Sequence, residues 1–295
     1  MIIDVHTHIW PKNELTPFYI EYFKSRNLWD KSLTVVTAER LLKVMDSNDI
    51  ELSIVSSVSL EFGMGNEKLE RINLYVSEEI KKYPDRFIGF CTVDPFGGKL
   101  SIDLLRKSIE NLGFLGLKLH PSIQEFYPND KRIYPIYEIM QDYKLPILLH
   151  TGSIGIKPFK DSFSNPQYID EIACDFPDLS IIVGHSGKIW HDEAVMLLRK
   201  HKNIFMDIST NIGRSYEYRS KPMEWFLYKA KIWAGDLDRV LFGSDYPLYF
   251  QKETLEVLNE SIRSLNKMKK DFITDEDIKK INYLNAKYLI STFKS

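Results

Sequence analysis

The feature that most constrains this chain is a set of eight short apolar runs, each of which ends in polar or small residues. Most of the runs are continuous, as in the Pro-Ile-Leu-Leu of residues 146–149, rather than alternately apolar and polar. Continuous runs of this length are typical of strands that are covered on both faces, which means a parallel sheet. The runs cover residues 2–8, 52–58, 87–94, 116–120, 146–150, 180–185, 204–209 and 240–245.

The segments between these runs carry apolar residues at helical spacing. In residues 68–83, apolar side chains follow one another at intervals of three and four, which places them on one face of a helix. Similar patterns cover residues 37–47, 100–111, 133–143, 167–176, 193–200, 223–234 and 252–265. A strand followed by a helix, repeated eight times, predicts an α/β fold of the (β/α)8 TIM barrel type.

Two segments extend this plan. Residues 10–31 follow the first strand, are rich in aromatic side chains and are too long for a simple connection. In a barrel an insertion at this point lies near the active-site mouth, where it either forms a lid or packs against the outer helices. Residues 275–292 predict a C-terminal helix, which begins after Thr274 with Asp277 in a near capping box. We therefore expect residues 1–295 to form a single barrel domain.

Composition excludes several classes of protein. The 39 Lys and Arg residues nearly balance the 41 Asp and Glu residues, giving a net charge of −2, so nothing indicates nucleic acid or a membrane as a partner. No uncharged apolar run approaches the roughly 20 residues that cross a bilayer, and no signal peptide is visible. Two distant cysteines, Cys91 and Cys174, form no zinc or redox motif. We expect both to be buried and the protein to be soluble and cytoplasmic.

Polar side chains gather where the predicted strands end, which is where TIM barrels carry their catalytic residues. Five of the seven histidines fall there, whereas His191 and His201 lie in or near a helix and are expected at the surface. His6 and His8 share one face of a strand, because residues i and i+2 point the same way. They form either half a metal site or a hydrogen-bonded structural pair. The strand ends carry His6, His8, Asp94, Lys118, His120, His150, His185, Asp207 and Asp245.

Five segments, taken together, resemble the amidohydrolase superfamily, and in particular the amidohydrolase-2 branch that includes aminocarboxymuconate-semialdehyde decarboxylase-like enzymes. The segments are residues 3–8 (IDVHTH), 116–121 (GLKLHP), 146–152 (PILLHTG), 181–187 (IIVGHSG) and 241–247 (LFGSDYP). They follow the order of the first, fourth, fifth, sixth and eighth strands of that family. The match is specific for the superfamily and much less specific for a substrate.

The resemblance implies a metal site and its catalytic partner. It implies one divalent metal ion, usually Zn²⁺ with Mn²⁺ as the alternative, held by His6, His8, His150 and Asp245. Three imidazoles and a carboxylate suit such a borderline ion, which makes hydroxide available near neutral pH. The resemblance also implies that His185 is the catalytic histidine, while Asp245 takes a proton from the bound water. Asp207 is expected to support the ligands from behind.

Lys118 and His120 bear on the number of metal ions. In some branches of the superfamily a carboxylated lysine on strand 4 bridges two metals, whereas the branch resembled here usually holds one, with the lysine nearer the substrate. We favour one metal, and a simple ion pair between Lys118 and Asp94 is the structural alternative. Weaker candidates for binding substrate are Asp94, Trp190, Asn211 and Arg214. Each of these also has a plain structural interpretation as a cap, a packed side chain or a surface charge.

These residues are compatible with more than one reaction on a small molecule. The first interpretation is a metal-dependent hydrolase, in which activated water attacks an amide, lactone or ester carbonyl. The alternative is a metal-dependent, non-oxidative decarboxylase of an aromatic or unsaturated carboxylic acid, or a related hydratase. One set of metal ligands serves all three reactions, so the motifs do not choose between them. Relatives of this kind are often dimers, but no stretch of the sequence identifies an interface, so the sequence leaves open whether the protein is a homodimer.

Overall fold

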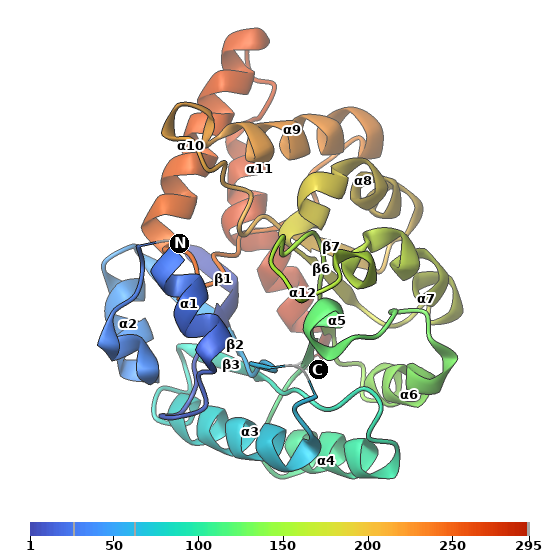
Figure 1. Ribbon diagram of the computed structural model, residues 1–295. Coiled ribbons are helices and arrows are strands. Elements are labelled where there is room, and N and C mark those ends of the chain that lie inside the picture. The colour runs from blue at the N-terminus through green and yellow to red at the C-terminus, as the bar shows by residue number, and fades with distance from the viewer. Residues whose placement is uncertain (26, 62, 294–295) are drawn as a thin grey trace.

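The computed structural model describes residues 1–25, 27–61 and 63–293. Within these residues, eight parallel strands alternate with helices, and Figure 1 shows the helices as a ring around the strands. The strands are β1 (Ile2–His8), β2 (Ile50–Ser56), β3 (Phe87–Phe90), β4 (Leu117–Leu119), β5 (Ile147–His150), β6 (Ile181–Gly184), β7 (Ile204–Asp207) and β8 (Val240–Leu241). Each strand follows its sequence neighbour in the order β1-β2-β3 and β4-β5-β6-β7-β8. The predicted (β/α)8 barrel is confirmed.

Backbone hydrogen bonds at two seams join these two sets of strands. Between β3 and β4, the amide of Cys91 donates to the carbonyl of Gly116 at 2.9 Å. Between β8 and β1, the amide of Asp245 donates to the carbonyl of His6 at 2.7 Å. A closed barrel leaves no strand edge unpaired and brings the carboxyl ends of all strands to one rim. The strand-end residues are therefore neighbours in space.

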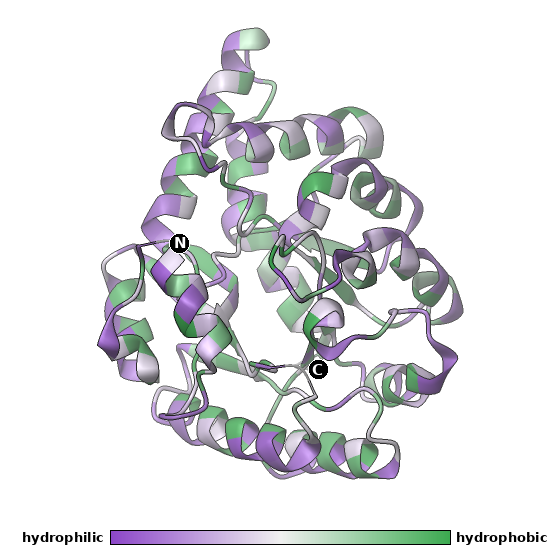
Figure 2. Ribbon diagram, in the orientation of Figure 1, coloured by the Kyte–Doolittle hydropathy of each residue, from purple (hydrophilic) through white to green (hydrophobic). Residues whose placement is uncertain are grey.

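Helices pack around the barrel with their apolar faces inward and their polar faces outward, as the colouring in Figure 2 shows. The helices of the ring are α2 (Ala38–Asp46), α3 (Asn66–Ile80), α4 (Lys99–Glu110), α6 (Tyr134–Asp142), α7 (Ile169–Asp175), α8 (His191–Lys200), α9 (Lys221–Lys229) and α10 (Gln251–Met268). The remaining α-helices are α1 (Pro17–Ser25), α5 (Pro121–Gln124), α11 (Asp275–Lys279) and α12 (Asn285–Phe293).

Burial on both faces explains why the apolar runs are continuous. In β5, Ile147, Leu148 and Leu149 are all fully buried, so side chains that point into the barrel and side chains that point toward the helices both lie in the core. Each such side chain contributes about 1.5–3 kcal/mol when it leaves water. An alternating pattern would have left polar side chains against the helices, which a parallel barrel does not tolerate.

The insertion after β1 packs some of its side chains into the core and turns others toward the mouth of the barrel. Trp10 is buried and its indole Nε1 donates to the carbonyl of Leu33 at 2.9 Å, and Phe23 on α1 is buried in the core. Phe18, also on α1, packs its ring against Phe159 with the centroids 4.6 Å apart. Tyr19 and its neighbours on the same helix face the mouth of the barrel. Both expectations for this segment therefore describe part of it, and a lid function stays a prediction.

The C-terminal helix covers the end of the barrel opposite the mouth. Thr274 and Asp277 form the predicted capping box, and a π-helical turn then separates α11 from α12. The side-chain amide of Asn285 donates to the carbonyls of Leu237 and Val240, at 2.7 and 2.8 Å, where β8 begins. In Figure 1, α12 lies behind the strands. The mouth at the other end is thereby left to the loops that follow the strands.

Several sequence expectations were wrong in detail. β8 ends at Leu241 rather than at residue 245, because the backbone leaves the extended region and Asp245 reaches a φ of 66°. His191 and His201 are buried, with 5% and 8% of their surface exposed, rather than at the surface. Their ring nitrogens bond to side chains of neighbouring elements, which satisfies them away from water. Cys91 is buried as expected, whereas Cys174 is exposed on α7.

Membrane insertion finds no support in the helices. Among the described residues, no helix combines the length and the apolar character that crossing a bilayer requires.

The β3–β4 seam gives a test of how tightly the barrel is packed. We expect Gly116→Ala to lower the free energy of unfolding by about 1–3 kcal/mol, because a methyl group at this position would overlap the buried ring of Phe90. Urea unfolding followed by circular dichroism measures this change. Gly65→Ser is the matched control, since Gly65 is an exposed N-cap with open space around it, and serine caps helices well. Equal stability of the two variants would contradict the packing argument.

Candidate metal centre and active site

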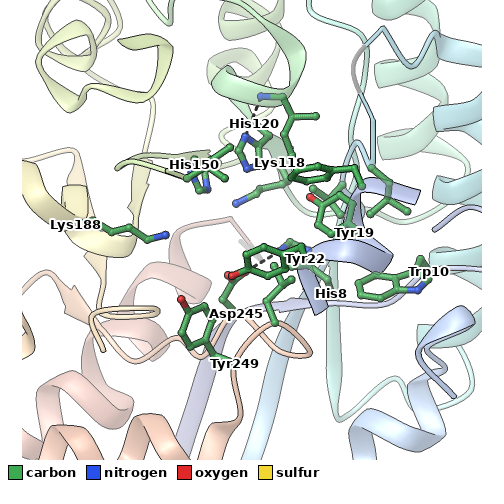
Figure 3. A pocket seen from close by; sticks show the side chains of 16 residues that line it. His8, Trp10, Tyr19, Tyr22, Lys118, His120, His150, Lys188, Asp245 and Tyr249 are labelled. Atoms are coloured by element: carbon green, nitrogen blue, oxygen red, sulfur yellow. Dashed lines mark hydrogen bonds and ion pairs between the residues drawn. The ribbon is translucent and has the colours of Figure 1, made fainter. Parts of the chain in front are cut away.

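A pocket opens at the carboxyl ends of the strands, and Figure 3 shows the side chains that line it. It holds about 650 Å³ of empty space, including the open solvent at its mouth. Histidine, lysine and aspartate side chains occupy the inner wall, and aromatic and aliphatic side chains occupy the rest. The lining residues are His8, Trp10, Phe18, Tyr19, Tyr22, Val58, Leu60, Lys118, His120, Ile123, His150, Ile154, Lys188, Asp245, Leu248 and Tyr249.

The hydrogen bond on one side of the His8 ring fixes what the other side can do. Nδ1 lies 2.9 Å from the carbonyl oxygen of Ser56, and because a carbonyl only accepts, Nδ1 carries the proton. Nε2 of a neutral ring is then a lone pair, and it lies 3.2 Å from Oδ1 of Asp245. Two acceptors at this distance repel each other unless a proton or a cation lies between them.

His6 repeats this arrangement. Its Nδ1 lies 3.0 Å from Oδ2 of Asp207. Burial raises the pKa of Asp207, but the neighbouring His6 and hydrogen bonds from Ser209 outweigh burial and hold the pKa below its usual value. Burial lowers the pKa of His6, so the ring is neutral and its Nδ1 donates to an ionised carboxylate. Nε2 of His6 is therefore another lone pair, 3.5 Å from Oδ1 of Asp245.

Three acceptors thus converge at the base of the pocket. Ligand atoms of His6, His8 and Asp245 all lie within 4.8 Å of one another, and all three residues are buried. Two imidazole nitrogens and a carboxylate oxygen are the donor set of a borderline divalent ion such as Zn²⁺ or Mn²⁺. The hydrogen bonds at both Nδ1 atoms orient the rings, as the partners of metal-binding histidines usually do. The residues present fit the metal that the resemblance implies.

His150, the fourth predicted ligand, borders this group without joining it as closely. It lines the pocket, and its ring stacks on that of His120 with the centroids 3.7 Å apart. Its Nδ1 lies 2.8 Å from Nε2 of His185, whereas its Nε2 is buried and has no hydrogen-bond partner. A buried polar atom without a partner costs about 1–3 kcal/mol. A bound metal or substrate atom would satisfy it.

His185 lies behind His150 rather than on the pocket wall. Its Nε2 contacts His150, and its Nδ1 lies 2.7 Å from Oγ of Ser209, which in turn bonds to Asp207. Its ring also stacks on His6, with the centroids 4.8 Å apart. In this geometry His185 links His150 to Asp207, so it orients a predicted ligand. The direct catalytic role expected for His185 stays a prediction.

Lys118 is placed against the metal-ligand group. It is fully buried, and its Nζ lies 2.9 Å from Nε2 of His6. Burial lowers its pKa to about 8, because desolvation disfavours the ammonium form. Asp94 does not pair with it, since that carboxylate accepts from the amide of Phe96 in its own loop at 2.9 Å. Lys118 and His120 both line the pocket, where they can contact substrate.

The weaker candidates separate into two groups. Asn211 is buried and supports the site from outside, because its side-chain amide donates to the carbonyl of His185 at 3.1 Å and its oxygen contacts His191 Nε2 at 2.9 Å. Arg214 is exposed in the loop after β7. Neither Arg214, Trp190 nor Asp94 is among the described residues that line the pocket.

Sequence reasoning missed several residues of the pocket wall. Tyr19 and Tyr22 lie in the aromatic insertion, which was expected near the mouth but without named residues. Tyr249 follows the strand-8 motif closely, and Lys188 is the residue directly after the strand-6 motif. Proximity to these motifs was the available signal. It was not enough, because the direction of a loop side chain depends on backbone angles that no motif specifies.

The fold and the site define a class of protein, the (β/α)8-barrel enzymes whose strand ends carry a cluster of metal ligands. The chain belongs to the amidohydrolase family: the model of that family, in its amidohydrolase-2 branch, matches residues 3–290. The expected family is therefore confirmed.

Individual relatives are distant. The chain is 22% identical to gamma-resorcylate decarboxylase of Polaromonas sp. (strain JS666), over 85% of this chain and 86% of that protein. Among solved structures, an uncharacterised TIM-barrel protein from Bordetella bronchiseptica has a TM-score of 0.71 at 20% identity, with 100% and 99% of the two chains covered. A dihydroxybenzoic acid decarboxylase from Polaromonas sp. JS666, with bound manganese and the inhibitor 2-nitroresorcinol, has a TM-score of 0.69 at 19% identity, covering 98% and 96%.

The three acceptors of His6, His8 and Asp245 lead to a prediction about the metal content of the protein. We expect His8→Ala to reduce the bound divalent metal from about one ion per chain to almost none, because it removes one of three close ligand atoms. Elemental analysis of protein purified without chelator measures this. Asp192→Asn is the control, since Asp192 is exposed and pairs with Lys229 away from the cluster, and it should keep its metal. Full metal content in His8→Ala would overturn the assignment of these ligands.

Proposed function

We propose that this protein is a metal-dependent, non-oxidative decarboxylase of an aromatic or unsaturated carboxylic acid, a carboxy-lyase that acts on a small molecule. The observation that carries the proposal is the position of Lys118, a cation 2.9 Å from His6 within the metal-ligand group. A carboxylate bound there would meet a positive charge at the place where the metal is expected. The Polaromonas relatives, a gamma-resorcylate decarboxylase and a dihydroxybenzoic acid decarboxylase, support this reaction.

Hydrolysis, the first interpretation from the sequence, is less well supported. A hydrolase of a neutral amide, lactone or ester needs a metal, water and an electrophilic carbonyl. It has no need for a buried ammonium group beside the metal ligands, and burying one is costly without an anionic partner. The aromatic side chains of Tyr19, Tyr22 and Phe18 also suit a flat, unsaturated substrate. We therefore place decarboxylation first.

A divalent ion held by His6, His8 and Asp245, with His150 beside them, would supply a Lewis acid that polarises a substrate oxygen. One such ion, Zn²⁺ or Mn²⁺, is sufficient for the proposal. The ammonium group of Lys118 binds the carboxylate and orients it. The aromatic wall from α1 excludes water, which strengthens these polar contacts.

The proton that replaces carbon dioxide has a source in the pocket. When the bond between the carboxylate carbon and its neighbour breaks, the electron pair stays on the neighbouring carbon, which must then be protonated. The carboxylate of Asp245 lines the pocket, and we assign to it the transfer of a proton from a water molecule to that carbon, which leaves carbon dioxide and hydroxide as the other products. His185, through its contact with His150, keeps that ring in place while the substrate turns over.

The proposed reaction is tested by its gaseous product. Protein loaded with Mn²⁺ or Zn²⁺ is incubated with carboxyl-labelled 2,6-dihydroxybenzoate and related aromatic and unsaturated acids, and labelled carbon dioxide is measured by mass spectrometry. We expect release with at least one acid and none with the Asp245→Asn variant. Lactones, amides and esters are assayed in parallel. Ring opening or ester cleavage without any carbon dioxide would establish a hydrolase and reject the proposal, and addition of water to an alkene would establish a hydratase.

The pKa of Lys118 gives a dependence on pH. Since its pKa lies at about 8, the ammonium form is present below pH 8 and is lost above it. We expect kcat/KM for an acid substrate to fall by a factor of about ten per pH unit above this point. Lys118→Met should reduce kcat/KM roughly ten-fold or more and should lack the alkaline decline. A decline at the same pH in Lys118→Met would show that another group causes it.

A further inference from the structure

Lys188 is a cation that the proposed reaction does not use. It follows β6 in the turn from His185 to Trp190, where four consecutive residues have positive φ: His185 (63°), Ser186 (49°), Gly187 (73°) and Lys188 (47°). Non-glycine residues in this region cost about 1–3 kcal/mol each. The turn directs Lys188 into the pocket, and Figure 3 shows it pointing inward from the wall that faces Lys118.

The neighbouring loop makes room for this side chain. A Cβ atom at Gly152 would lie 2.7 Å from Cβ and 2.8 Å from Cγ of Lys188, closer than such atoms approach. The absence of a side chain at Gly152 therefore lets the stem of Lys188 lie directly on the loop after β5. The ammonium group has a weak contact with the carbonyl of Ser153, at 3.4 Å. No ion pair to Lys188 is found among the residues that the structure describes.

The two lysines lie at different depths. Lys118 is fully buried beside His6, whereas Lys188 is partly buried and nearer the mouth. Both side chains line the same pocket. The field of Lys188 therefore acts inside the pocket rather than on the outer surface. Two cations on the wall of one pocket match a ligand that carries two negative charges.

We propose that Lys188 binds a second acidic group of the substrate, so that the substrate is a planar carboxylic acid with a further carboxylate nearer the mouth. The inference rests on the proposed function for the place of the first carboxylate, next to Lys118. A salt bridge to a second carboxylate supplies the partner that Lys188 lacks in the protein. It also gives the strained turn after β6 a function, because the turn is what aims the ammonium group inward.

Binding of unreactive acids tests this without turnover. The probes are benzoate, isophthalate (1,3-dicarboxylate) and terephthalate (1,4-dicarboxylate), titrated by calorimetry into the metal-loaded protein. We expect at least one dicarboxylate to bind the wild type about ten-fold more tightly than benzoate does. Lys188→Met should lose this preference while its affinity for benzoate changes less than two-fold. Lys188→Arg should keep it, and so should Lys202→Met, which removes an exposed charge elsewhere.

Three outcomes would overturn the inference. They are a wild type without preference for either dicarboxylate, a Lys188→Met variant that retains the preference, and a Lys188→Met variant that loses affinity for benzoate and dicarboxylates equally. The last would mean that both lysines bind the same carboxylate. Thermal unfolding checks that Lys188→Met folds, and Lys188→Gln serves as the second variant. Because no reaction is needed, a failure here leaves the carbon dioxide assay unaffected, and a protein that releases no carbon dioxide can still show the preference.

Discussion

The site depends on the hydrogen bonds that the buried carboxylate of Asp207 accepts. One oxygen accepts from the His6 ring, and the other accepts from Ser209 and from the backbone amide of His185. A carboxylate buried without donors would be very costly, and here its donors are the groups that carry the site. Because Asp207 only accepts while it is ionised, it also determines that His6 presents a lone pair toward the pocket. Stability and metal-ligand geometry therefore rest on the same hydrogen bonds.

Closure of the barrel explains how His6 and Asp245 meet although they are 239 positions apart in the sequence. The seam between β8 and β1 places the backbone of Asp245 against that of His6, and the positive φ of Asp245 and His185 turns their side chains away from the strand direction. Such backbone conformations persist only where the surrounding structure holds them. Asp245 and His185 both belong to the rim where the predicted ligands gather, although non-glycine residues with positive φ, such as Asn13 and Asp271, also occur elsewhere in the fold.

The pocket divides its tasks between the barrel and the insertion. The strand ends supply imidazoles, carboxylate and Lys118, to which the proposed function assigns the binding of the metal and of the reacting carboxylate. The segment after β1 supplies Tyr19, Tyr22 and Phe18, and the turn after β6 supplies Lys188. The proposed reaction class rests on the first set, whereas the proposed shape and charge of the substrate rest on the second. Relatives that share the barrel can therefore differ in substrate through these loops alone.

Periodicity and spacing were sufficient to predict the barrel, the shared face of His6 and His8, and the gathering of strand-end residues. The shared face follows from the two-residue repeat of a strand, which is a local property. The gathering follows from the topology, because all strands of a parallel barrel end at one rim. Strand ends were less predictable: β3 stops at Phe90 rather than at residue 94, although the backbone of Cys91 still pairs with the neighbouring chain at Leu117. Only the tertiary structure decided that His185 lies behind His150, that His191 and His201 are buried, and that Lys188 enters the pocket. Each of these depends on backbone φ and ψ angles and on the side chains packed nearby. The spacing of residues in the sequence specifies neither the angles nor the packing.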